Sequence, residues 1–184
     1  MTPSDSTYGV SSRTRPGGRR QPHAVPRRAR SQGPLELLQR DHENIQSEFE
    51  GFQTAGGDDR YFLANRVLRE LELHARVEAD VFYPALQAHV DRQANRKAST
   101  VMRTAWKEHQ AIQAHLAKMK DSRAHDEAFI SQIDGLMQRV QLHMAMEERE
   151  VFPLAQALLG DTGLSRLQRY VETRREELDH DLAA

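Results

Sequence analysis

The 184-residue sequence contains no cysteine, which excludes disulfide bonds, cysteine-ligated zinc, thiolate-bound iron–sulfur clusters and cysteine nucleophiles. Aromatic residues make up only 6% of it, and glycine and proline are few, with ten and seven copies. This composition suits a helical protein better than a β-sandwich or a barrel. No apolar run approaches the roughly 18 residues that a membrane span needs, so we expect a soluble, cytoplasmic protein without membrane contact. The length accommodates one ordinary domain and a tail.

Negative charge is nearly missing from residues 1–33, which hold seven arginines and one acidic residue, Asp5. Their net charge of +6 contrasts with −7 for residues 34–184. Because residues 1–33 also have few bulky apolar side chains, burial cannot offset the entropy cost of ordering them, and we predict a disordered tail. A solvated leader is the favoured interpretation, and a basic arm that contacts nucleic acid is the less favoured one.

From residue 34 onward, apolar residues recur at helical spacing in four segments. The segments end, in order, at Gly56-Gly57, in the polar stretch 90–100, at Asp121-Ser122 and over Gly160 to Gly163. Four amphipathic helices with short connections predict an all-α, antiparallel up-down four-helix bundle over residues 34–184, with its core in residues 35–160. A short fifth amphipathic helix is expected at about residues 164–179.

Six polar residues interrupt the apolar seams at positions that face the predicted core. They are His42, His74, Glu78, His109, His143 and Glu147. A lone histidine on an apolar face is usually a core residue with satisfied hydrogen bonds, but buried carboxylates without partners cost several kcal/mol, so the set needs a shared explanation. At a rise of about 1.5 Å per residue, the four histidines fall near one layer of an up-down bundle. In each His-x-x-x-Glu pair, the i, i+4 spacing puts both side chains on one helix face.

An internal repeat relates the two halves of the predicted bundle. Residues 40–46 and 107–113 share the pattern basic, acidic, His, two variable residues, Ile-Gln. A His-x-x-x-Glu pair follows each, and a proline stands six residues after the glutamate, at Pro84 and Pro153. Such pseudo-twofold symmetry suits a two-metal centre with shared glutamates. The donors favour iron, since manganese prefers more oxygen and zinc is usually four-coordinate.

The order His, His-x-x-x-Glu, His, His-x-x-x-Glu on a four-helix bundle resembles the hemerythrin-like HHE family, over about residues 35–160. The resemblance implies that the six residues bind two iron ions in a non-haem di-iron centre, with bridging carboxylates and an exchangeable position for O₂, NO or peroxide. Oxygen-carrying hemerythrins have a histidine where Gln113 stands, and an aspartate five residues after the fourth-helix histidine, where Glu147 stands at four. The sequence is therefore more similar to the bacterial branch of the family.

We predict a hemerythrin-like protein that binds or senses O₂, NO or peroxide, its expected small-molecule partner. A peroxide-consuming, catalase-like enzyme is the alternative, because the same ligands serve both. A metal-free helical interaction module is a further alternative. No oligomeric state follows from the sequence. A ferritin-like site is disfavoured, because its paired Glu-x-x-His motifs are missing from the core.

Residues outside the six are assigned no part in the site. Tyr83 and Trp106 are interpreted as packing or rim residues. The other histidines that we expect to be solvated are His23, His89, His125 and His180. In the metal-free core, we expect burial to raise the pKa of Glu78 or Glu147 so that one of them takes up a proton.

Overall fold

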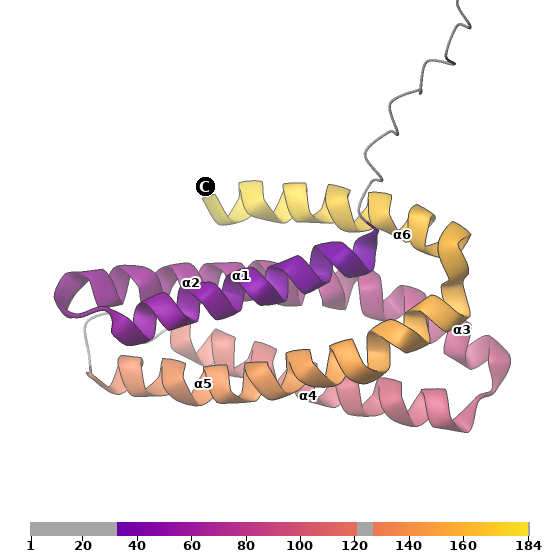
Figure 1. The fold of residues 1–184 in the computed structure, drawn as a ribbon, viewed down its shortest axis with the longest axis horizontal. Coiled ribbons are helices and arrows are strands. Elements are labelled where there is room, and N and C mark those ends of the chain that lie inside the picture. The colour runs from indigo at the N-terminus through magenta and orange to yellow at the C-terminus, as the bar shows by residue number, and fades with distance from the viewer. Residues whose placement is uncertain (1–32, 121–126, 184) are drawn as a thin grey trace, which may run out of the picture. The chain divides into compact units, whose positions relative to one another are not determined.

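The fold was obtained as a computed structural model, which describes residues 33–120 and 127–183 (Figure 1). Nearly all of the predicted tail lies outside these residues. Every element in the described part is helical. The elements are α1 (Pro34–Thr54), α2 (Gly57–Val77), the π-helical turn η1 (Glu78–Phe82), α3 (Tyr83–Gln93), α4 (Arg96–Lys120), α5 (Glu127–Met146), the π-helical turn η2 (Glu147–Val151) and α6 (Phe152–Ala183).

Four helical columns form the predicted antiparallel bundle (Figure 1). The first column is α1, and the second is the continuous run of α2, η1 and α3. The third is α4, and the fourth consists of α5, η2 and the beginning of α6. Helix α1 packs along α2, and α4 packs along α5, as short connections between neighbouring helices require. None of the described helices combines the length and the apolar character needed to cross a membrane.

Helix α6 changes direction at Gly160, whose φ of 57° and ψ of −179° are not helical. Glycine adopts a positive φ at little cost, so it suits this break. Residues 161–183, called the C-terminal helix below, run alongside α1 and α2 (Figure 1). This fifth helix extends beyond the predicted range of 164–179 at both ends. Val171 and Leu178 are among the side chains that it buries.

Two columns widen into a π-helical turn at the glutamate of each His-x-x-x-Glu pair. The turn η1 begins at Glu78 and η2 at Glu147, and in each the N–H five residues later donates to the glutamate carbonyl. The next residue is the repeat proline, Pro84 or Pro153. Because proline has no N–H, it cannot complete the α-helical bond to the carbonyl four residues earlier, and a wider turn carries the column past it. These turns were not predicted from the sequence, although the shared spacing from glutamate to proline was a signal for them.

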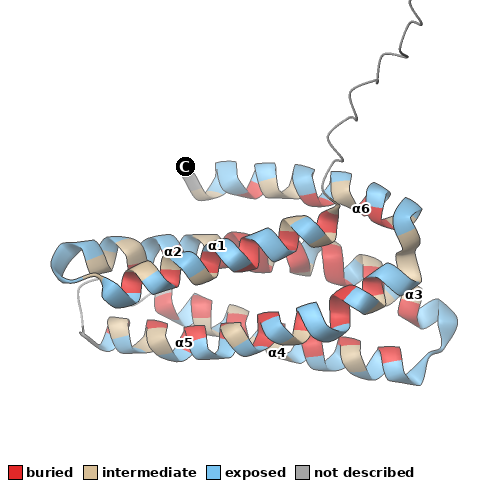
Figure 2. Cartoon of the chain, in the orientation of Figure 1, coloured by how far each residue is buried: buried red, intermediate tan, exposed pale blue. Residues whose placement is uncertain are grey.

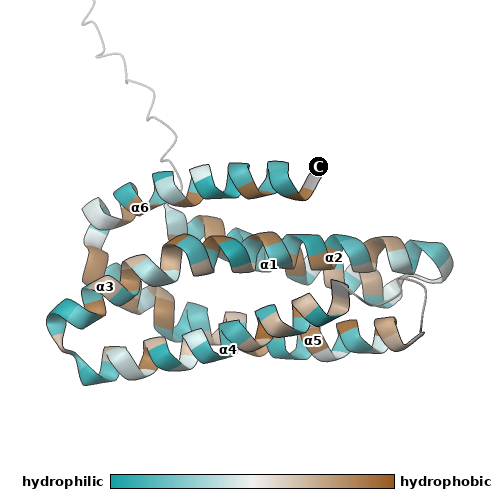
Figure 3. Cartoon of the chain, turned by 180° about the vertical axis from the view of Figure 1, so that it is seen from behind, coloured by the Kyte–Doolittle hydropathy of each residue, from teal (hydrophilic) through white to brown (hydrophobic). Residues whose placement is uncertain are grey.

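Two apolar clusters fill the bundle, one on each side of the polar layer along its axis. One cluster includes Leu38, Phe82 and Leu86, and the other includes Ile45 and Ile133. Figure 2 shows the buried positions on the inward faces of the helices, and Figure 3 shows the matching apolar stripes. Burial of each large apolar side chain contributes about 1.5–3 kcal/mol, so these clusters hold the columns in register around the polar layer.

Candidate metal centre

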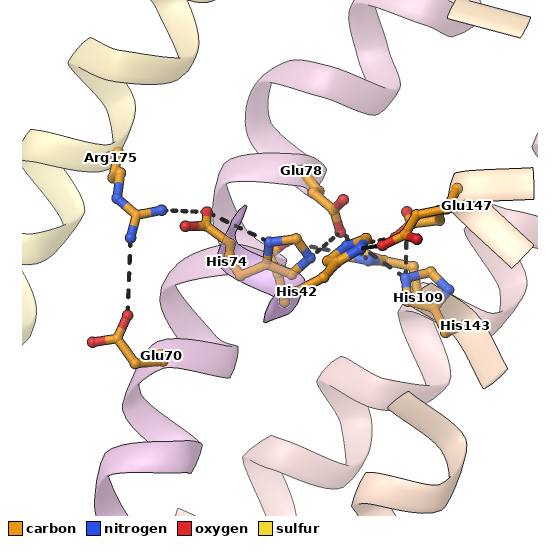
Figure 4. A network of polar contacts seen from close by, with 11 residues as sticks. His42, Glu70, His74, Glu78, His109, His143, Glu147 and Arg175 are labelled. Atoms are coloured by element: carbon orange, nitrogen blue, oxygen red, sulfur yellow. Dashed lines mark hydrogen bonds and ion pairs between the residues drawn. The ribbon is translucent and has the colours of Figure 1, made fainter. Parts of the chain in front are cut away.

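All six predicted site residues lie together in the middle of the bundle (Figure 4). The four columns each contribute at least one of them, and no side chain of the set is more than 4% exposed. The set consists of His42 from α1, His74 from α2, Glu78 from η1, His109 from α4, His143 from α5 and Glu147 from η2. The helical spacing of the sequence therefore predicted that these six side chains lie in one layer, and the structure places them there.

A first group of donor atoms comes from His42, His74, Glu78 and Glu147, and these atoms all lie within 4.8 Å of one another. The Nε2 atom of His42 is 3.3 Å from Oε2 of Glu147. The Nε2 atom of His74 is likewise 3.3 Å from Oε2 of Glu78. Two imidazoles and two carboxylates thus converge in one place.

A second group comes from His109, His143 and Glu78. Oε2 of Glu78 is 3.5 Å from Nδ1 of His109 and 4.0 Å from Nε2 of His143. Glu147 also reaches this group, since its Oε1 is 3.4 Å from Nε2 of His143. Both glutamates therefore lie between the two groups, which is the arrangement that a pair of ions with shared carboxylates needs.

Many of the buried polar atoms of the six residues lack a hydrogen-bond partner among the described residues. They include Nε2 of His42, both ring nitrogens of His74 and of His143, both carboxylate oxygens of Glu78, and Oε2 of Glu147. Buried polar atoms in proteins are nearly always paired, and an unpaired one costs about 1–3 kcal/mol. A cation satisfies unpaired imidazole nitrogens and carboxylate oxygens together, so these residues fit a metal centre.

Two of the histidines are oriented by acceptors outside the six. The Nε2–H of His109 donates to the backbone carbonyl of Ala75 at 2.8 Å, which leaves Nδ1 as the free nitrogen that faces Glu78. His42 places Nδ1 at 2.8 Å from Oε1 of Glu148 and directs Nε2 inward. Partners of this kind set the tautomer and the ring orientation of a metal-binding histidine.

His74 and His143, the two histidines of the His-x-x-x-Glu pairs, differ in what lies near their Nδ1 atoms. Nδ1 of His74 is 3.7 Å from Oδ2 of Asp41, an ion-pair distance longer than a hydrogen bond, and Arg175 pairs with that same oxygen. Nδ1 of His143 is buried and has no hydrogen-bond partner in the described part of the chain. The two halves of the repeat thus carry equivalent ligands with different surroundings.

Tyr83 belongs to the site, although the sequence analysis interpreted it as a packing or rim residue. Its side chain is buried, and its hydroxyl donates a hydrogen bond to Oε1 of Glu147. Burial, together with the negative charges of Glu147 and Glu78, raises the pKa of Tyr83, so the hydroxyl keeps its proton. Its ring packs against His109 with centroids 5.1 Å apart. The sequence signal was its position just before the repeat proline.

The expectation that burial protonates a site glutamate is wrong for Glu78. Burial does raise its pKa, but the charge of His74 and the close imidazoles of His109 and His143 lower the pKa well below its usual value. Burial lowers the pKa of His74, yet the charge of Glu78 and contacts with Asp41 and Glu78 raise it to about 10. In the metal-free core the proton therefore resides on an imidazole, which balances the buried carboxylate.

Other polar residues near the centre contribute no donor atom to either group. Gln113, which stands where the oxygen carriers have a histidine, lines a surface pocket with Ala75. His115 is half-buried, and burial followed by the charges of Arg139 and Lys118 lowers its pKa. Of the histidines predicted to be solvated, His89 is half-buried and bonds to the carbonyl of Ala85, His180 is exposed, and His23 and His125 lie outside the described residues.

A helical bundle that turns four imidazoles and two carboxylates toward one point has the architecture of a cation-binding domain. Residues 27–155 match the family described as the hemerythrin HHE cation-binding domain, and the chain belongs to that family, as the order of its motifs predicted.

Two relatives accompany this match. An uncharacterized hemerythrin-like protein of Schizosaccharomyces pombe is 25% identical over 142 residues, which cover 73% of this chain and 68% of the relative. The crystal structure of a hemerythrin HHE cation-binding domain-containing protein from Mycobacterium kansasii shares the fold, with a TM-score of 0.66 and 22% identity. That comparison covers 82% of this chain and 89% of the other.

Proposed function

We propose that this chain holds two iron ions without haem and binds or senses O₂, NO or peroxide. The observation that carries the proposal is the position of Glu78, whose carboxylate belongs to both groups of donor atoms. Glu147 supports it, because its two oxygens face histidines of different groups. Two ions that share carboxylates explain why so many buried donor atoms lack partners within the protein.

The donor chemistry supports iron as the metal. Nitrogen and carboxylate donors without sulfur suit iron, whereas zinc is usually satisfied by four ligands. With two imidazoles and a share of two carboxylates, each ion has about four protein donors, which leaves about two positions of an octahedron for other ligands. Bound iron supplies redox chemistry and an exchangeable position for a small ligand. The protein supplies a buried site that excludes bulk water and holds the donor side chains in place.

A pocket of about 400 Å³ between α3 and α4 supports access by a small ligand. Its lining is mostly apolar and includes Met102, Trp106 and Tyr83. The buried Tyr83 separates this pocket from Glu147 and His109, both of which it contacts. A small uncharged molecule that enters the pocket therefore comes within one side chain of the site.

Consumption of hydrogen peroxide is the second candidate function. It is favoured by the even division of the histidines, with His42 and His74 in one group and His109 and His143 in the other. Reversible oxygen carriage is best served by an unequal pair, in which one ion is saturated and the other is open. Disproportionation of two peroxide molecules to O₂ and two water molecules needs no external reductant. Two ions with equal numbers of histidine ligands therefore suffice for it.

Metal analysis and rapid-mixing spectroscopy of the full-length protein test both functions. We expect about two iron ions per chain, irreversible oxidation of the reduced protein in air, and loss of added hydrogen peroxide in the presence of the oxidised protein. Release of intact O₂ under vacuum would favour carriage instead. Peroxide loss that persists in both Glu78→Ala and Glu147→Ala would point to adventitious iron. A purified protein without iron, even after reconstitution, would contradict the proposal.

A further inference from the structure

The C-terminal helix lies beyond residue 155, where the match to the family ends, yet it is linked to the centre. Arg175 of this helix pairs with Oδ2 of Asp41 on α1. The same oxygen lies 3.7 Å from Nδ1 of His74. In Figure 4, a line of contacts runs from Glu70 through Arg175 to the carboxylate beside His74, and from His74 to the glutamates of the centre. A residue near the end of the chain is thus two contacts away from a group of donor atoms.

Arg175 connects three helices at this place. Its second nitrogen, Nη2, lies 3.9 Å from Oε2 of Glu70 on α2, while Nη1 pairs with Asp41 on α1. Asp41 is only 8% exposed, and a carboxylate at that depth needs a positive partner. Arg175 is the arginine that pairs with Asp41 in the described structure, and it keeps the carboxylate facing His74.

The other half of the repeat lacks this connection. Glu108 is the counterpart of Asp41 in the repeat, but it pairs with Arg139 at 3.4 Å, and both side chains are more than 40% exposed. His143 is the counterpart of His74, and its buried Nδ1 has no hydrogen-bond partner among the described residues. The C-terminal helix therefore supports the histidine of one half only.

We propose that Arg175 is a positioning residue of the metal centre, which acts through Asp41 on His74 so that the ion held by His42 and His74 is bound more tightly than the other ion. The inference rests on the proposed function, because it requires that both groups hold iron. A carboxylate behind a metal-binding histidine fixes the ring and strengthens the metal–nitrogen bond, and loss of such a partner typically weakens metal affinity by about 10–100-fold.

Ferrous iron, titrated without oxygen into metal-free full-length protein against a coloured ferrous chelator, provides the test. We expect two affinities in the wild type, and a loss of about 10–100-fold in the tighter one for Arg175→Met. The matched control is Arg174→Met. Arg174 lies on the same helix and pairs with Asp80 at 2.8 Å and Glu177 at 2.9 Å, neither of which is one of the six site residues. The control should keep both affinities.

A double-mutant comparison separates positioning from general support of the fold. The effect of Arg175→Met should vanish in a His74→Ala background and persist in a His143→Ala background. Asp41→Asn should reproduce it, and Arg175→Lys should restore most of the affinity and the wild-type visible spectrum of the iron-loaded protein. Equal weakening of both ions by Arg175→Met and by the control would show that the helix merely supports the bundle, and would overturn the inference.

The two possible failures are distinguishable. If the wild type binds two ions and Arg175→Met leaves both affinities unchanged, only the positioning role is wrong. If the wild type binds no ferrous iron, the proposed function itself is wrong.

Discussion

The two halves of the bundle contribute equivalent candidate metal ligands and surround them differently. Each half supplies one histidine from its first helix, and an aromatic ring stacks on that histidine at an interplanar angle of 16°. The ring is Phe152 on His42 and Trp106 on His109. The acceptor behind each histidine differs, since it is Glu148 in one half and a backbone carbonyl in the other. The two halves of the repeat therefore have the same kinds of donor residue, but the groups that contact and orient those residues differ.

The clearest difference lies five residues after each shared glutamate. Tyr83 occupies this position in the first half, and its hydroxyl donates to Glu147. Phe152 occupies it in the second half and has no hydroxyl for Glu78. One shared carboxylate thus has an oxygen held by a tyrosine, while both oxygens of the other lack a hydrogen-bond partner among the described residues. Two ions with matched ligands would then sit in unequal surroundings.

The largest effect is expected from Glu78→Ala, because this residue belongs to both groups. We expect the iron content to fall from about two ions per chain to nearly none. His74→Ala and His109→Ala should each remove mainly the ion of their own half. Elemental analysis of the purified proteins measures this, with Glu150→Ala, an exposed residue within η2, as the control. Full iron content in Glu78→Ala would show that the halves do not share this carboxylate.

Removal of iron from the wild type should destabilise both halves together. A ligand present at about 1,000 times its dissociation constant adds about 4 kcal/mol to the free energy of unfolding. For a protein of this size, that corresponds to a fall in Tm on the order of 10 °C when the metal is stripped. Calorimetry of the iron-loaded and chelator-treated proteins checks it. Equal melting temperatures would favour the metal-free interaction module.

Tyr83→Phe would make the two halves alike at the position where they differ most clearly. It removes a buried hydrogen bond to a charged acceptor, and such a bond contributes about 1.5–3 kcal/mol to the free energy of unfolding. We therefore expect a lower free energy of unfolding by about that amount in urea denaturation, with the iron content retained and the visible spectrum of the iron-loaded protein shifted. A spectrum and a stability identical to those of the wild type would mean that the hydroxyl does not act on Glu147.

The smallest effect is expected from deletion of the predicted tail, residues 1–33, which lies outside both halves. Iron content and helical circular dichroism of the remaining chain should stay unchanged. If the full-length protein binds nucleic acid through this arginine-rich segment, the affinity should fall steeply with salt and disappear on deletion. Binding that survives the deletion would place the contact on the bundle instead.

The fold and the six site residues follow from local patterns, which explains why they could be predicted. Apolar spacing defines each helix, and the i, i+4 relation of His74 and Glu78 fixes their common face without knowledge of any other helix. Tyr83 and Arg175 act on partners 64 and 134 residues away, so their roles depend on how the packed helices line up. No pattern along the chain records that alignment.

The length of the C-terminal helix was missed for a different reason. Gly160 and Gly163 both looked like breaks in the pattern, but only Gly160 has a non-helical backbone. Gly163 lies within the helix, close to Leu159. Glycine permits a break without requiring one, so neighbouring contacts decide which glycine ends a helix.

The π-helical turns have a consequence for the rotation of each long column. An extra residue in one turn rotates everything after it by about 100° relative to an unbroken α-helix. Before η1, the column directs His74 toward the other donors. After η1, it directs Leu86 and Val90 into the apolar cluster shared with the C-terminal helix. One column thus faces two different neighbours, and an ordinary α-helical turn formed by the same residues in place of η1 would rotate the apolar face of α3 away from its cluster.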